Sequence, residues 1–305
     1  MPPTPHSRPW MSFLPAEIPG TEPIRAGEGR TAYDDAAAAA TRAQVEVRTL
    51  GTTEELEVAA KLFTDLWQSP FSAHLLRAFE LSGNYVAGAF DDSHRLVGAS
   101  LAFAAVGAEP ELHSHVTAVA TSKRRSGAGL ALKLHQRAWA LERGIAVITW
   151  TFDPLVKRNA VFNLARLGAT ADRYLENIYG DMDDAINKSD ESDRLWACWR
   201  LADPRVETVL RGSSARVAAP AGFEALRCSP AGLPVVSAGS ATADGTLICG
   251  VPEDIETLRS TDPALAAAWR RALRQVMGGT LARGGCLLGV NDDGDYVLRE
   301  LAEGP

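Results

Sequence analysis

A glycine-containing loop between an apolar strand and an amphipathic helix restricts the fold of this chain more than any other feature. The segment runs Val119-Ala-Thr-Ser-Lys-Arg-Arg-Ser-Gly-Ala-Gly-Leu130, so three basic side chains stand just before two glycines. The first N–H groups of a helix have no partner within the helix and carry the positive end of its dipole. Glycines let a phosphate approach the backbone closely. We therefore expect an anion site here, with a ligand-free glycine turn as the alternative.

Two better-known phosphate-binding motifs are absent from the loop. The chain has no G-x-x-x-x-G-K-[ST], so hydrolysis of a magnesium nucleotide is not indicated. The dinucleotide pattern G-x-G-x-x-G also fails, because Leu132 stands where the third glycine belongs. What remains is Arg124-x-x-Gly127-x-Gly129.

The order of the surrounding elements predicts an α+β fold. Periodicity indicates a strand at 45–50, helices at 53–67 and 72–81, strands at 85–90, 96–106 and 112–120, a helix at 129–143, a strand at 146–152, a helix at 156–167, and strands at 174–179 and 195–201. This is not the strict β-α alternation of a doubly wound sheet. We expect a mixed, largely antiparallel sheet with helices on both faces.

In this context, Arg124-x-x-Gly127-x-Gly129 resembles the pyrophosphate loop of the GNAT superfamily of acyl-CoA N-acyltransferases. The resemblance covers about residues 44 to 202. It implies that the loop amides bind the pyrophosphate of coenzyme A and that the preceding strand pairs with the pantetheine arm. It also implies that the strand at 146–152 splays away to leave a slot for the thioester. The implied binding residues are Val119, Ala120, Thr121, Arg124, Arg125, Ser126, Gly127, Ala128, Gly129 and Leu130.

The helix at 156–167 departs from the family pattern N-x-x-A-x-x-x-Y-x-x-x-G. Leu164 stands at the position of the tyrosine that protonates the leaving thiolate, and Lys157 stands at the asparagine. The general acid is therefore unassigned. Asn159 and Asn163, spaced i and i+4, are candidates to contact the cofactor. Their alternative is a solvated or capping face.

His113 is the candidate general base. It lies six residues before Val119, where histone-acetylating members of the superfamily carry a glutamate, and a neutral imidazole can take a proton near pH 7. His115 shares its strand face by the period of two. A structural role stays open for both, and so does a zinc site, although no third ligand stands out.

Other polar residues have two readings each. Asp153 is expected near the acceptor end of the slot, where it would hold a cationic amine, or else in an Asp-Pro turn that only ends the strand. Tyr174 and Tyr179 are spare candidates for the acid or packing residues. The run from Asp181 to Asp184 suggests a solvated loop, with cation recognition as the alternative.

The chain divides into three parts by composition. Residues 1–43, rich in proline, glycine and alanine, are expected to form a mobile tail with one helical turn docked at its end. Residues 44–202 form the acyl-CoA-binding domain. Residues 203–305 are expected to form a small α+β subdomain, with a helix from 262 and a hairpin of 286–290 with 296–301. This subdomain would either cover the acceptor slot or form a homodimer contact.

Charge and cysteine content narrow the class of protein. The 31 basic and 38 acidic residues give a net charge of −7, which argues against nucleic-acid binding. No secretory signal and no apolar run of ~18 residues is present, so we expect no membrane partner. Four cysteines without a C-x-x-C pair fit reduced thiols in a cytoplasmic protein.

These features together predict an acyltransferase that moves an acetyl or other acyl group from acyl-CoA to an amine. The acceptor is a small molecule or a protein, and no metal is expected. Two alternatives stay open at this point: a non-catalytic acyl-CoA sensor or scaffold, and a histidine-metal hydrolase.

Overall fold

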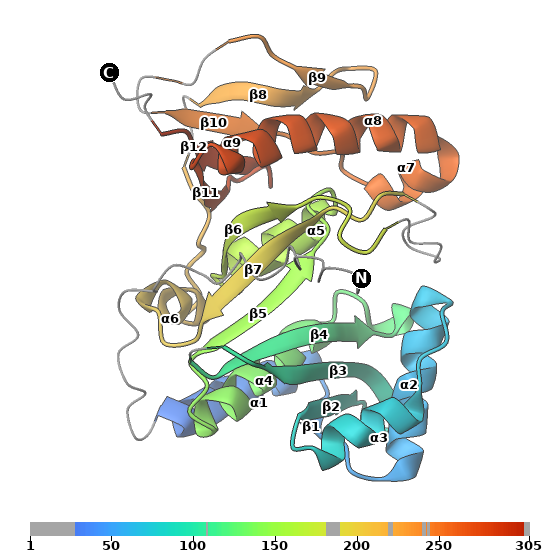
Figure 1. The fold of residues 1–305 in the computed structure, drawn as a ribbon. Helices are drawn as coiled ribbons and strands as arrows, with labels where there is room; N and C mark the ends of the chain where they lie inside the picture. The colour runs from blue at the N-terminus through green and yellow to red at the C-terminus, as the bar shows by residue number, and fades with distance from the viewer. Residues whose placement is uncertain are drawn as a thin grey trace, which may run out of the picture.

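The computed structural model describes residues 28–301 except 108, 181–189, 219–221, 240–241 and 243–244. Two sheets organise these residues, one of seven strands and one of five (Figure 1). The larger sheet and its helices consist of α1 (Glu28–Ala43), β1 (Glu46–Thr49), α2 (Thr53–Trp67), α3 (Ala73–Leu81), β2 (Tyr85–Phe90), β3 (Leu96–Ala105), β4 (Glu111–Val119), η2 (Thr121–Lys123), α4 (Ala128–Glu142), β5 (Val147–Phe152), α5 (Lys157–Ala160), η3 (Val161–Arg166), β6 (Thr170–Leu175) and β7 (Arg194–Arg200).

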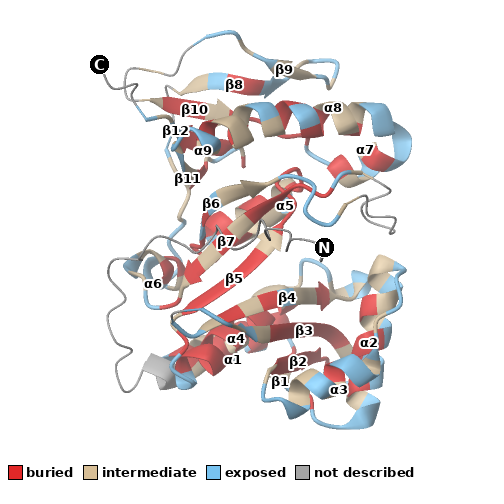
Figure 2. Ribbon diagram, viewed as in Figure 1, coloured by how far each residue is buried: buried red, intermediate tan, exposed pale blue. Residues whose placement is uncertain are grey.

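The seven-stranded sheet is mixed and largely antiparallel, as expected. Its strand order is β1-β2-β3-β4-β5-β7-β6, and only the β4–β5 pair is parallel. Helices α2 and α3 bury Phe63 and Leu76 against Leu101 on one face. Helices α1 and α4 cover the other face, where the continuous buried core lies (Figure 2).

Helix α1 corrects the expectation that the N-terminal tail extends to residue 43. Its sixteen residues form a full helix rather than one turn. Five alanines, Ala32, Ala36, Ala39, Ala40 and Ala43, are all buried, because small side chains let the helix pack closely on α4. Tyr33 adds a hydrogen bond of 3.2 Å to Glu142. The rest of the expected tail, residues 1–27, lies outside the described residues.

Local signals placed most elements within a few residues. Helix α2 is capped by Thr52 rather than Thr53, with Glu55 completing a capping box. The helix expected at 156–167 is a short α-helical turn continued by the π-helical segment η3. Strand β6 begins at Thr170, four residues before the expected start.

The C-terminal unit has a five-stranded sheet of order β11-β12-β10-β8-β9, with helices packed between it and the larger unit (Figure 1). Its elements are α6 (Pro204–Leu210), β8 (Phe223–Cys228), β9 (Pro234–Val236), β10 (Thr246–Cys249), α7 (Ile255–Thr261), α8 (Pro263–Leu273), η4 (Arg274–Gly278), α9 (Gly279–Ala282), β11 (Cys286–Val290) and β12 (Tyr296–Arg299). The expected helix and hairpin are present, with Asp262 capping α8. Strands β8 and β9 lie in a stretch rich in alanine, glycine, proline and serine, for which the sequence predicted no strand.

All four cysteines are free. Among the helices in the described parts of the chain, none combines the length and the apolar content that a bilayer crossing needs.

Candidate active site

The parallel strands β4 and β5 separate after three residue pairs. Glu111 pairs with Val147, Leu112 with Ile148 and His113 with Thr149, and no pairing follows although both strands continue. A bulge on β4 leaves His115 without a partner on β3, because Val116 faces Leu101 and Ser114 faces Ala102. The two strands therefore diverge beyond His113 and Thr149, and we call the region between the diverging strands the slot, with its closed end at these two residues.

One edge of this slot carries backbone groups of β4. The Ala120 N–H donates to the Val97 carbonyl on β3 at 2.8 Å. Since backbone groups alternate in direction along a strand, those of Thr117 and Val119 point away from β3 toward the slot. They are available to pair with an extended ligand.

The predicted anion loop follows β4 directly and opens α4. Arg125 and Gly127 adopt positive φ values of 67° and 98°, which reverse the chain before α4 begins at Ala128. The Ser126 hydroxyl accepts the Ala128 N–H at 3.3 Å. Among the described residues, Arg124 and Arg125 have no carboxylate within ion-pair distance, and both are exposed. The loop therefore presents positive charge beside the first turn of α4.

Gly129 is not required by the backbone of α4. It has no positive φ, and an added Cβ would meet only Val119 Cγ2 at an ordinary 3.7 Å. Glycine costs a helix about 1 kcal/mol relative to alanine. No close packing contact at Gly129 explains why the chain accepts this cost. A glycine here fits a position that a ligand approaches closely.

A basic groove lies beside the same helix. It has a volume of about 570 Å³ and receives side chains from α1, α4, η3 and the end of α6, including Arg42, Leu130, Leu134, Arg166 and Arg211. Arg211 pairs with Glu207 at 3.1 Å. Arg42 and Arg166 have no ion-pair partner among the described residues. The groove extends the positive surface from the loop.

The two asparagines of the next helix differ in burial. Asn163 is buried, whereas Asn159 is half-buried, and the change to π-helix at Val161 alters the spacing between them. Leu164 is buried in the main core, so the position of the family's tyrosine is apolar here.

His113 lies at the closed end of the slot, on the face covered by α3. Its Nδ1 lies 3.3 Å from the Thr149 hydroxyl, and Phe103 packs against both His113 and His115. Trp196 lies 5.5 Å from His113 between ring centroids. Burial, with the charges of His115 and Lys133, lowers the pKa of His113 to about 4. The imidazole is therefore neutral at pH 7, with an aromatic surface around it.

Asp153 does not lie free at the acceptor end of the slot. Its carboxylate accepts hydrogen bonds from Arg270 at 2.9 and 3.0 Å and pairs with Arg259 as well. The arginines hold the pKa of Asp153 well below its usual range even though burial alone would raise it. Both oxygens are occupied, so the expectation that Asp153 binds an amine is replaced by a structural role.

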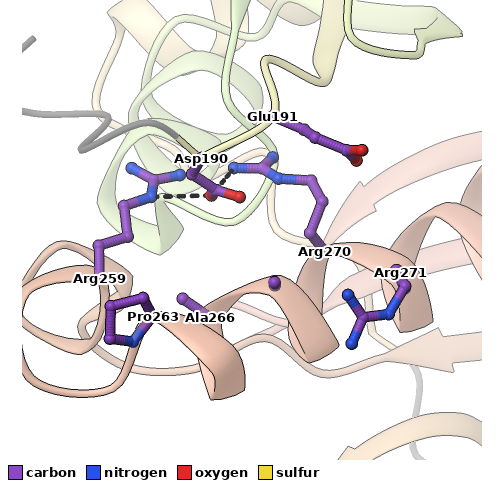
Figure 3. Close-up of a pocket in the computed structure, with 8 residues that line it drawn as sticks. Asp190, Glu191, Arg259, Pro263, Ala266, Arg270 and Arg271 are labelled. Atoms are coloured by element: carbon purple, nitrogen blue, oxygen red, sulfur yellow. Dashed lines mark hydrogen bonds and ion pairs between the residues drawn. The ribbon is translucent and has the colours of Figure 1, made fainter. Parts of the chain in front are cut away.

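The same arginines line a cavity of about 180 Å³ between the two units. Figure 3 shows Arg259 and Arg270 converging on Asp190, at 3.0 and 2.6 Å. Arg194 also contributes a positive charge, with its guanidinium 3.8 Å from the Asp153 carboxylate. These contacts join β5, the segment before β7, and helices α7 and α8.

Tyr174 and Tyr179, the spare candidates for the general acid, differ in burial. Tyr174 is half-buried against the main core and donates to Asp193 at 2.7 Å, which supports packing rather than catalysis. Tyr179 is exposed and lies 3.2 Å from the Thr151 hydroxyl on β5. The run Asp181 to Asp184 lies outside the described residues.

Lys133 is a residue that sequence reasoning missed. It is only 5% exposed, and its Nζ donates to Ser114 Oγ at 2.8 Å and to Gln136 Oε1 at 3.2 Å. Burial lowers its pKa to about 7. The available signal was a lysine one turn into a helix that otherwise packs on the sheet.

Within the described parts of the chain, no three His, Cys, Asp or Glu side chains lie close enough together to hold a metal ion. His113 and His115 share a strand face, as their common contact with Phe103 shows. No third ligand joins them among those residues.

The larger unit has the arrangement that the GNAT resemblance implied: a mixed sheet whose one parallel pair splays beside a glycine loop. Among solved structures, the chain is similar to the ribosomal-protein-S18-alanine N-acetyltransferase of Escherichia coli, with 17% identity, a TM-score of 0.42, and coverage of 52% of this chain and 95% of that one. It is also similar to Naa20 of Chaetomium thermophilum in complex with a bisubstrate analogue, with 16% identity, a TM-score of 0.44, and coverage of 55% and 90%. A third similar structure is yncA of Salmonella typhimurium with acetyl-CoA, with 11% identity, a TM-score of 0.44, and coverage of 52% and 95%.

No protein-family model matches the chain, and no curated protein matches it. The assignment of the fold of the larger unit therefore rests on its strand order and on the separation of β4 from β5.

Proposed function

We propose that residues 44–202 bind acyl-CoA and transfer its acyl group to an amine. The observation that carries the proposal is the slot between β4 and β5. Its edge offers unpaired backbone groups, and the strand that forms this edge runs directly into the glycine loop of α4. An extended amide chain that ends in a pyrophosphate has the shape and charge to fit both features.

Each part of coenzyme A has a place in this arrangement. The pantetheine arm would pair with the backbone of Thr117 and Val119. The pyrophosphate would accept hydrogen bonds from the first N–H groups of α4, with Arg124 and Arg125 neutralising its charge. The remaining phosphate would lie in the basic groove near Arg42 and Arg166.

The acceptor would approach from the opposite face of the sheet, where His113, His115 and Phe103 lie. Its nitrogen attacks the thioester carbonyl, and slot-facing amides near Val119 stabilise the developing oxyanion. An imidazole with a pKa of about 4 is a weak base toward an ammonium with a pKa near ~10. His113 would therefore orient a water through which the proton passes to the solvent.

Calorimetric titration with acetyl-CoA tests the binding step, with Gly129→Ala as the informative variant. A Cβ at Gly129 fits the fold but occupies the space assigned to the pyrophosphate. We expect acetyl-CoA affinity to fall at least about tenfold, while the unfolding free energy rises by up to about 1 kcal/mol. Gly51→Ala is the matched control, because Gly51 also has open space and lies away from the slot.

Equal affinity of wild type and Gly129→Ala would remove the loop from the proposed site. Release of free thiol in the presence of a panel of primary amines then tests transfer itself. Saturable binding without thiol release from any of them would support the acyl-CoA sensor instead.

The expected acid limb of the pH profile follows from the pKa of His113. Since this pKa is lowered to about 4, His113 stays neutral throughout the range where an ordinary imidazole becomes protonated. We expect kcat/KM to show no loss attributable to His113 between pH 7 and 5. A limb near pH 6.5 that disappears in His113→Gln would contradict the buried environment of this residue.

A further inference from the structure

Lys133 lies where β4 and β5 part. Its Nζ lies 2.8 Å from Ser114 Oγ and 4.1 Å from the centroid of the Trp150 ring. Ser114 and Trp150 each follow directly after His113 and Thr149, the last residues paired between the two strands. The ammonium therefore lies at the closed end of the slot, on the face of the sheet that α4 covers.

The charge of Lys133 is buried without a counter-ion. Among the described residues, its hydrogen bonds go only to the neutral oxygens of Ser114 and Gln136, and no carboxylate lies within ion-pair distance. Its other favourable contact is with the Trp150 ring, whose centroid lies 4.1 Å from Nζ. A methionine or leucine would fill the same space without the cost of a buried charge. A ligand atom in the slot would explain why the amine is present.

The surrounding groups hold the amine in one direction. Gln136 accepts from Lys133 and donates through Nε2 to Ser100 Oγ at 3.4 Å, and Ser100 in turn lies 2.8 Å from the Thr117 hydroxyl. These contacts orient the Gln136 amide so that its oxygen faces Lys133. They link α4, β3 and β4 into one polar network beneath the slot.

His113 is the titratable group that faces Lys133 across the sheet. Burial, the charge of His115 on the same strand and the charge of Lys133 together lower the pKa of His113. On β5, Trp150 packs against the amine, and Ser100 on β3 is connected to it through Gln136. On α4 itself, His135 points to Tyr85 and Arg137 toward Asp35. The slot thus has an imidazole on one face and an amine on the other.

We propose that Lys133 is the proton donor to the thiolate of coenzyme A that leaves during acyl transfer, an inference that rests on the function proposed above. The acceptor nitrogen forms a bond to the thioester carbon, and the carbon–sulfur bond breaks with its electron pair on sulfur. Lys133 Nζ gives its proton to that sulfur and regains one from water after the thiol departs. The acceptor ammonium loses two protons in all, so each turnover yields an amide, a free thiol and one proton to solvent.

The protonation equilibrium of Lys133 suits this role. A pKa of about 7 leaves a large fraction of the amine protonated at neutral pH. An alkyl thiol such as cysteine has a pKa of about 8.5, so transfer from this ammonium to a thiolate is favourable. Leu164, at the position of the family's tyrosine acid, is buried and apolar and has no proton to give.

Binding of coenzyme A and of desulfo-coenzyme A, which lacks the sulfur atom, tests the contact without turnover. In calorimetric titrations at pH 7, wild type should bind coenzyme A about tenfold more tightly than the desulfo compound. Lys133→Met should bind the two equally. The same ratio in both proteins would overturn the role of Lys133, whereas failure of both ligands to bind wild type would overturn the proposed function itself.

The pH dependence of thiol release separates proton donation from a structural effect. Comparing kcat/KM for acetyl-CoA with the amine that gives the fastest thiol release, we expect wild type to exceed Lys133→Met by about 100-fold at pH 6. The ratio should fall as pH rises through about 7, because wild type then loses its ammonium. A ratio that does not change with pH would overturn the proposal.

Two further variants control for charge and for folding. Lys133→Arg keeps the positive charge but cannot release a proton, so it should be as slow as Lys133→Met if proton transfer matters. Full activity of Lys133→Arg would contradict proton donation. Lys61→Met, at an exposed position of α2, should leave activity and thermal unfolding unchanged.

Discussion

Two of the places where the described residues bury charge differ in how that charge is compensated. Asp153 and Asp190 are surrounded by Arg259 and Arg270 at the junction of the two units. Lys133 lies beneath the slot with only neutral hydrogen-bond partners. The arginines hold the pKa of Asp153 well below its usual range, whereas burial lowers the pKa of Lys133 to about 7. The first arrangement suits a structural role at the junction of the two units, and the second suits proton transfer.

Removal of one charge from the paired cluster should have the largest effect on stability. Asp153→Asn keeps the shape of the side chain but leaves two buried arginines with Asp190 as their remaining shared carboxylate. Breaking such a buried pair costs about 3–5 kcal/mol. We expect the unfolding free energy in a urea titration to fall by this amount. A loss below about 1 kcal/mol would mean that water or Asp190 compensates the arginines, and the contrast with Lys133 would weaken.

Lys133→Met should have the opposite sign. Removing an unpaired buried charge should stabilise the protein by a few kcal/mol at pH 6. The folded pKa of about 7 lies below the unfolded value of 10.5, so the unfolded chain binds more protons between these values. Wild-type stability should therefore rise relative to Lys133→Met as pH increases from 7 to 10.5. Urea titrations at pH 6, 8 and 10 measure this difference, and a constant difference would show that the amine is not buried as described.

An exposed ion pair across the same junction should matter least. Arg158 and Glu256 bridge α5 and α7, but Arg158 is 61% exposed. Pairs of this kind contribute about 0–1 kcal/mol, so Arg158→Ala should change the unfolding free energy by no more than that. Arg158→Ala and Asp153→Asn both remove a charge at the same junction, and the two ion pairs differ in how far they are buried. Equal effects of the two substitutions would assign the stability of the junction to something other than its buried charges.

The comparison also explains which residues the sequence could reveal. Asp153 was expected at the acceptor site because it ends the splayed strand, and this position along the strand is correct. Its partner Arg270 lies 117 residues away, on a helix whose place no local pattern predicts. The error therefore concerns the partner and not the strand.

Helix α1 and Lys133 were missed for a related reason. A run of alanines has no apolar stripe of large side chains, so its sequence does not predict a packed helix. Only the contact between α1 and α4 shows that these alanines are buried. Lys133 follows Leu132 in a helix where Leu130, Leu134, Ala138 and Leu141 suggested a single apolar face. The helix is instead covered by α1 on one side and the sheet on another, so Lys133, Gln136 and Arg137 are buried too.

Local sequence predicts the glycine loop, the order of strands and helices and the strand position of His113, because these depend on periodicity, turn chemistry and spacing within a few residues. Only the tertiary contacts show that β4 and β5 part after His113 and Thr149, that distant arginines pair with Asp153, and that the described residues offer Lys133 no counter-ion. Burial and pairing of charge depend on residues brought together from far along the chain. They set the pKa of Asp153 and of Lys133, and no pattern of neighbouring residues contains that information.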